Sequence, residues 1–167
     1  EVFSREYLFV VEGNLCFSRG FYQDAKMYYE KAIQIEPKLS SALLNLLFCY
    51  AKIGNREEHE AMVAKLMQER SLLPSVLYMI GNSYLLLGEQ RKGEQFYEKL
   101  KEYDGWENKI DHYRSTFCHE HQMFEEALHY AKKAFQASPN NTAVSYHLSL
   151  CYNSVGEKDK ALDMVKR

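Results

Sequence analysis

Histidine and cysteine, the side chains most suited to binding a transition metal, gather in one stretch of the chain: His112, Cys118, His119, His121 and His129. If this stretch is helical, His112 and His119 lie two turns apart on one face, too far apart to share an ion. Cys118 is expected to face the core, and no CxxC pair or HExxH motif accompanies the cluster. We therefore expect no metal site. Because imidazole titrates near neutral pH, these histidines would make binding here pH-dependent.

No other set of residues supports catalysis. The chain has no glycine-rich phosphate loop, no GxSxG motif, and no Cys, His and Asp placed together on predicted turns. The carboxylates of Glu57, Glu58 and Glu60 are mixed with basic residues, which is typical of a solvated helix face. The sequence predicts a protein that is not an enzyme and uses no cofactor.

Composition narrows the choice of partners. The net charge of −2 over 167 residues gives no general attraction to nucleic acid or to an anionic membrane, and the longest apolar runs are too short to span a bilayer. The four cysteines recur at equivalent core positions, which favours buried thiols and a reducing compartment. We expect a cytoplasmic protein, with the nucleus as the alternative. Because the sequence starts without Met and stops inside a helical pattern, we expect it to be a piece of a longer protein.

The chain repeats itself every 34 residues. Glycine recurs on this period at Gly20, Gly54, Gly88 and Gly156, with Gln122 in the remaining copy. Each glycine lies between two amphipathic helical patterns, so the unit is a helix–turn–helix. The predicted units are 6–39, 40–73, 74–107, 108–141 and a truncated 142–167, which together form one array over residues 1–167.

The second unit departs from the pattern at His59. The other units have a small residue there: Ala25, Gly93, Ala127 and Ala161. Because an imidazole is too bulky for a close helix contact, we expect the helix that carries it to rotate or splay, with Ala61 making the contact instead.

These positions give the chain a resemblance to the tetratricopeptide repeat (TPR) family. The matches are small residues at unit position 8 (Gly13, Gly81) and position 20, alanines at position 27 (Ala32, Ala134) and prolines at position 32 (Pro37, Pro139). The resemblance implies an all-α, right-handed superhelical solenoid. It also implies a concave groove, lined by the first helix of each unit, that binds a segment of another protein.

The residues expected to face this groove follow from the same register. They are apolar and aromatic side chains with a row of asparagines, followed by two histidines: Tyr7, Val10, Asn14, Phe17, Leu44, Asn45, Phe48, Tyr78, Met79, Asn82, His112 and His119. An asparagine amide can pair with a partner's backbone whatever its sequence. The alternative is that several of these residues only pack between neighbouring helices.

One TPR subset binds the C-terminal carboxylate of chaperones through two asparagines and three cations. Asn14 and Asn45 match the asparagine positions, but Val10, Ser75 and Met79 occupy the cationic ones. Without cations the carboxylate has no charge partner, so we do not expect this clamp. The sequence predicts a non-catalytic adaptor that binds a peptide segment. The alternative is a structural scaffold that uses its outer face or array ends, including self-association through the uncapped last unit.

Overall fold

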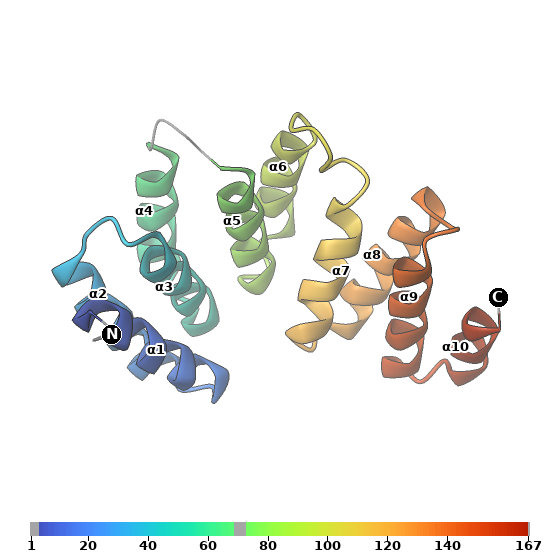
Figure 1. Ribbon diagram of the computed structural model, residues 1–167, viewed down its shortest axis with the longest axis horizontal. Helices are drawn as coiled ribbons and strands as arrows, with labels where there is room; N and C mark the ends of the chain where they lie inside the picture. Colours follow the sequence, from blue (N-terminus) through green and yellow to red (C-terminus); the bar gives the residue numbers. More distant parts are fainter. Residues whose placement is uncertain (1–3, 69–72, 167) are drawn as a thin grey trace. The chain divides into compact units, whose positions relative to one another are not determined.

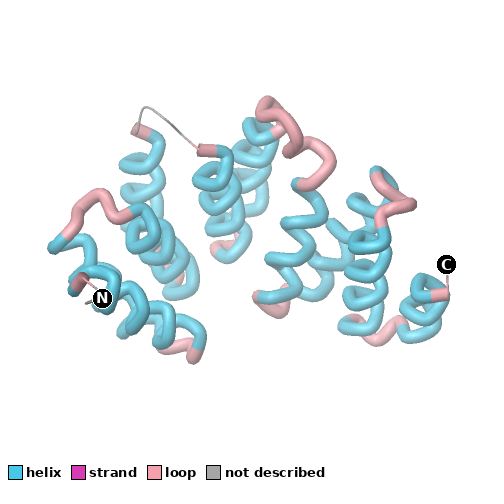
Figure 2. Tube along the Cα trace, viewed as in Figure 1, coloured by secondary structure: helices cyan, strands magenta, loops and turns pink. Residues whose placement is uncertain are grey.

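The computed structural model describes residues 4–68 and 73–166, and within these residues it contains ten α-helices and no strand (Figures 1 and 2). The helices are α1 (Arg5–Ser18), α2 (Tyr22–Ile35), α3 (Ser40–Ile53), α4 (Arg56–Met67), α5 (Pro74–Leu86), α6 (Gln90–Leu100), α7 (Ile110–Glu120), α8 (Phe124–Ala137), α9 (Thr142–Ser154) and α10 (Lys158–Val165). They form five helix pairs, one for each 34-residue unit. None of these helices is long and apolar enough to cross a membrane.

The turn inside each pair uses a left-handed residue. Gly54 ends α3 with φ of 80°, and glycine adopts this conformation without a steric penalty. Gln122 takes the same role between α7 and α8 with φ of 62°, although it carries a side chain. The repeat pattern therefore fixes the backbone at this turn even where its usual residue is missing.

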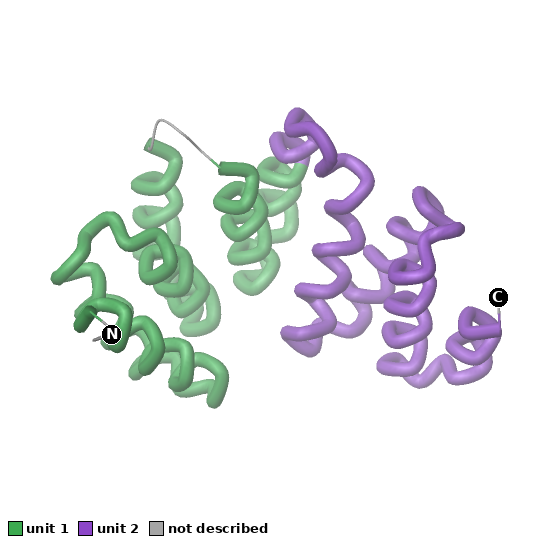
Figure 3. The backbone as a smooth tube through the Cα atoms, in the orientation of Figure 1, with its two compact units in different colours: residues 1–97 green, residues 98–167 purple. Residues whose placement is uncertain are grey.

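The chain divides into two compact units, residues 1–97 and 98–167 (Figure 3). In unit 1, α3 contacts α1, α2, α4 and α5, and its apolar side chains fill the core, including the fully buried Leu47 and Cys49. In unit 2, α7 packs on α8 and α9, and α9 packs on α10. The single array over residues 1–167 stays a prediction.

Glycine and tyrosine pack together in two of the helix pairs of unit 1. A Cβ atom on Gly13 of α1 would lie 2.5 Å from the ring of Tyr29 on α2. A Cβ on Gly81 of α5 would lie 2.8 Å from Tyr97 on α6. Both rings are buried. The glycines therefore make room for a tyrosine ring as well as allowing two helices to approach each other.

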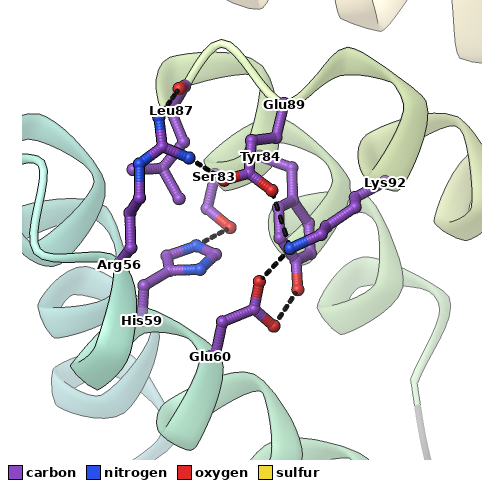
Figure 4. Close-up of polar contacts among 8 residues, drawn as sticks. All are labelled: Arg56, His59, Glu60, Ser83, Tyr84, Leu87, Glu89 and Lys92. Atoms are coloured by element: carbon purple, nitrogen blue, oxygen red, sulfur yellow. Dashed lines mark hydrogen bonds and ion pairs between the residues drawn. The ribbon is translucent and has the colours of Figure 1, made fainter.

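The prediction for His59 is wrong. Its side chain is fully buried, and Ala61 is exposed. The His59 ring contacts Tyr84 edge to face and lies 2.8 Å from the Ser83 hydroxyl (Figure 4). Because Ser83 Oγ donates to the Ile80 carbonyl, His59 Nε2–H is the donor to Ser83. The Ser83 hydroxyl and the Tyr84 ring accommodate the imidazole at a position where the other 34-residue repeats have a small residue.

Charged residues surround this joint between α4, α5 and α6 (Figure 4). Glu60 accepts hydrogen bonds from the Tyr84 hydroxyl at 2.8 Å and from Lys92 at 2.6 Å. Lys92 also pairs with Glu89 at 2.7 Å, and Glu89 pairs with Arg56. The network links α4 to the following helix pair. Beside it, burial lowers the pKa of His59 to about 4, although the nearby Glu60 carboxylate acts weakly in the opposite direction.

The cysteines are free thiols: Cys16 is half-buried, and Cys49, Cys118 and Cys151 are buried. Burial raises the pKa of the Cys49 and Cys118 thiols to about 12. Such thiols stay protonated at neutral pH, which fits the predicted role of small core residues.

Candidate peptide-binding site

The described part of unit 1 has a pocket of about 210 Å³ between its first two helix pairs. The residues that line it are Asn14, Phe17, Ser18, Tyr29, Asn45 and Phe48. Asn14, Phe17 and Ser18 come from α1, Asn45 and Phe48 from α3, and Tyr29 from α2. The α1 and α3 residues share faces because their spacings are close to whole helical turns. The pocket thus combines aromatic surface with amide and hydroxyl groups.

The two asparagines hold each other in place. Asn14 Oδ1 accepts hydrogen bonds from the Tyr29 hydroxyl at 2.7 Å and from Asn45 Nδ2 at 2.8 Å. Burial raises the pKa of the Tyr29 hydroxyl, so it remains a donor at neutral pH. The amide hydrogens of Asn14 and the carbonyl oxygen of Asn45 have no partner within the described residues. These are the groups through which the pocket can bind a ligand.

A lysine lies beside this pocket. Lys52 follows Phe48 by one turn on α3, and its ammonium lies 5.9 Å from the centre of the Tyr22 ring. Tyr22 contacts Phe17 edge to face at 5.1 Å between ring centres. Burial lowers the pKa of Lys52, and no carboxylate within the described residues forms an ion pair with it. Lys52 therefore places a positive charge one helical turn from Phe48, a residue that lines the pocket.

Three predicted groove residues belong to the interior instead. Asn82 is 1% exposed and accepts a hydrogen bond from the Tyr97 hydroxyl at 2.6 Å, so its prediction as a contact residue is corrected. Val10 and Leu44 are also buried and are part of the core of unit 1. Packing within and between the helix pairs removes these side chains from the surface.

The other predicted residues of unit 1 remain accessible to different degrees. Tyr7 is 52% exposed on α1, whereas Tyr78 and Met79 are half-buried on α5, where Met79 packs against the core. None of the three lines the 210 Å³ pocket. Their role in binding stays a prediction.

In unit 2, His112 and His119 lie on either side of His147 from α9. The ring centres are 5.5 Å apart for His112 and His147, and 5.7 Å apart for His119 and His147. His147 Nε2 lies 2.9 Å from Ser115 Oγ, and His119 Nε2 lies 2.8 Å from Ser154 Oγ. Burial, followed by the effects of His112 and then His119, lowers the pKa of His147. Within the described residues, no three His, Cys, Asp or Glu side chains are placed to hold a metal ion.

A family model matches almost the whole chain. The model describes ChAPs, the Chs5p-Arf1p-binding proteins, and it matches residues 2–166. The chain belongs to the ChAPs family.

Solved structures show the fold of this ChAPs chain. TTC0263, a thermophilic TPR protein of Thermus thermophilus, has a TM-score of 0.58 and 18% identity, covering 95% of this chain and 87% of its own. A MamA protein has a TM-score of 0.53 and 16% identity, covering 96% and 88%. YrrB, described as a TPR protein with an unusual peptide-binding site, has a TM-score of 0.50 and 18% identity, covering 95% and 81%. The predicted resemblance to TPR proteins and the predicted all-α solenoid class are confirmed.

Sequence reasoning missed the role of Tyr29 in this ChAPs chain and the clustering of His147 with two other histidines. Tyr29 lies on the second helix of its pair, whereas the family register assigns only first-helix residues to the groove. The repeat register gives His147 an inward-facing position in the fifth 34-residue repeat, but only its contacts with His112 and His119 show that the three rings form a cluster. A search for a tyrosine paired with each glycine at unit position 8 would have found Tyr29.

Proposed function

We propose that the chain is a non-catalytic adaptor that binds a peptide segment of a partner protein in the pocket of unit 1. The observation that carries this proposal is the pocket lined by Asn14, Phe17, Asn45 and Phe48, four residues that the repeat register assigned to a binding groove. The pocket offers apolar ring surface together with unpaired amide groups, and a peptide needs both.

The family supplies candidate partners. ChAPs are named for binding Chs5p and Arf1p, and we propose that a protein of one of these two kinds provides the segment. An adaptor of this type needs no charge-rich surface, which agrees with the net charge of −2.

The test is a binding assay with the immobilised chain and purified Chs5p and Arf1p. Ser18→Phe places a ring in the pocket, and Asn45→Ala removes an amide from it; circular dichroism checks that both variants fold. We expect about a tenfold loss of affinity for one of the two proteins in both variants, because Asn45→Ala removes a hydrogen bond worth about 1–2 kcal/mol and the ring of Ser18→Phe occupies the space that the ligand needs. Lys65→Gln, an exposed change on α4, is the control and should leave affinity unchanged.

The second candidate function is a structural scaffold segment in a larger assembly. It is favoured by apolar side chains exposed on unit 2, since Tyr146, Leu162 and Val165 are all more than half exposed. Tyr146 and Val165 also line a pocket of about 640 Å³. If Leu162→Ser with Val165→Ser abolishes partner binding or self-association while Ser18→Phe has no effect, the scaffold replaces the adaptor.

A further inference from the structure

The pocket of unit 1 has the size and chemistry to take one side chain. Its volume of about 210 Å³ is below the roughly 300–1,000 Å³ of a typical small-molecule site. Phe17 and Phe48 offer ring surface, against which a flat aromatic side chain packs well. A single aromatic residue of an extended segment is therefore a better match than a whole helix face.

The polar groups of the pocket indicate which aromatic side chain fits best. Asn14 Oδ1 is already used twice, by Tyr29 and by Asn45, so it is not available to a ligand. The Asn14 amide hydrogens and the Asn45 carbonyl remain, and together they offer both a donor and an acceptor. A buried phenol hydroxyl requires such a partner, whereas a phenylalanine ring would leave these groups unpaired.

A positive charge lies one helical turn from the pocket residue Phe48. Lys52 is a half-buried residue, its ammonium lies beside the Tyr22 ring, and it has no carboxylate partner within the described residues. An isolated cation that has lost part of its hydration gains more from a carboxylate than a fully exposed one does. Since Lys52 is one helical turn from Phe48, a carboxylate that reaches it comes from a residue close to the one in the pocket.

We propose that the pocket binds a tyrosine side chain of a partner protein and that Lys52 pairs with an Asp or Glu next to that tyrosine. This inference rests on the proposed function, because it names the segment that the adaptor recognises. It differs from the chaperone clamp in its binding groups: the carboxylate belongs to a side chain and meets one lysine, and the apolar pocket takes a ring.

The test is a selection of nine-residue random peptides displayed on phage against the full chain and three variants, Lys52→Gln, Ser18→Phe and Lys65→Gln. We expect the wild-type chain and Lys65→Gln to select tyrosine with Asp or Glu within two positions. Lys52→Gln should still select tyrosine but without the acidic residue, and Ser18→Phe should select neither.

Affinities of one selected peptide then measure the two contacts separately. Lys52→Gln should weaken binding about tenfold, as expected for a charge-assisted hydrogen bond, and should have no effect on the peptide whose acid is changed to its amide. Replacing tyrosine by phenylalanine should weaken binding about fivefold for the lost hydrogen bond, and replacing it by alanine at least a hundredfold.

The outcomes distinguish this inference from the proposed function. Acidic selection that survives Lys52→Gln, or selection of leucine in place of tyrosine, overturns the inference and leaves a pocket that still binds. If Ser18→Phe selects the same peptides as the wild-type chain, the pocket does not bind them, and the proposed function fails as well.

Discussion

The two units build their first-helix faces from different polar groups. In unit 1 the pocket uses Asn14, Asn45 and Tyr29, none of which changes charge near neutral pH. In unit 2 the corresponding face contains His112, His119 and His147, with Ser115 as the partner of His147 and Ser154 as the partner of His119. The same repeat therefore builds one surface from amide and phenol groups and the other from imidazoles, of which His112 and His147 have pKa values lowered by burial.

The units also differ in how they fill the space between paired helices. Unit 1 places glycine opposite a tyrosine ring, at Gly13 with Tyr29 and at Gly81 with Tyr97. At the same two repeat positions, unit 2 has Ser115 with Ala131. Tyr29 extends its hydroxyl to Asn14 and so orients a polar group of the pocket, and Tyr97 extends its hydroxyl to the buried Asn82. A large residue on one helix thus requires a small one on the other.

The largest expected effect is a loss of stability of unit 1 at acid pH. It comes from His59, the histidine of unit 1, which is fully buried. The pKa of His59 falls to about 4 in the folded chain, from the ordinary histidine value of about 6.5. The folded state thus favours neutral His59, and its contribution is complete above about pH 6.5 and is lost as pH falls from there to about 4. That loss amounts to about 3 kcal/mol of unfolding free energy.

Urea unfolding of wild type and His59→Leu at pH 7, 5.5 and 4.5 measures this effect. The variant should be less stable at pH 7 but should lose less stability on acidification. Equal slopes against pH in the two proteins would mean that His59 does not stay neutral in the folded state.

Gly13→Ala should break the packing that distinguishes unit 1. The added methyl would lie 2.5 Å from the Tyr29 ring, which is buried and anchored by its hydrogen bond to Asn14. We expect a loss of about 2 kcal/mol in stability by urea unfolding, after the gain in helix propensity is offset by overpacking. Ser149→Ala, at the same repeat position in unit 2, is the matched control and should cost about 1 kcal/mol or less. Comparable losses in the two variants would contradict the steric explanation.

Predictions from the sequence were accurate where a position is determined by the repeat. The helix pairs and the glycine turns follow from register, because the local backbone repeats with the sequence. Asn14, Phe17, Asn45 and Phe48 line one pocket, and their role in binding stays a prediction. Predictions failed where a specific partner decides the outcome. His59 is buried because Ser83 and Tyr84 lie beside it, and Asn82 is buried because Tyr97 reaches it. Neither partner is visible in a pattern that treats each helix position separately.

His147→Gln tests whether the histidine cluster of unit 2 makes stability depend on pH. The pKa values of His112 and His147 are both lowered by burial, so folding favours the neutral rings and stability is lost as pH falls below about 6.5. Removing the His147 ring removes one of the groups whose pKa is lowered in the folded chain. The unfolding free energy of His147→Gln should therefore depend less steeply on pH than that of wild type. An unchanged slope, with His59 intact in both proteins, would show that the cluster does not couple protonation to folding.

Gln122→Gly should give the smallest effect and the only gain. Gln122 has φ of 62° in the turn between α7 and α8, where the turns of the other pairs have glycine. A side chain in this conformation costs about 1–2 kcal/mol, but glycine also gives the unfolded chain more freedom. The net gain in unfolding free energy should be about 0.5–1 kcal/mol. Gln122→Ala keeps the penalty of a Cβ atom and is the control that should show no such gain. A loss of stability on Gln122→Gly would mean that the glutamine side chain makes contacts that stabilise the turn between α7 and α8 by more than its backbone conformation costs.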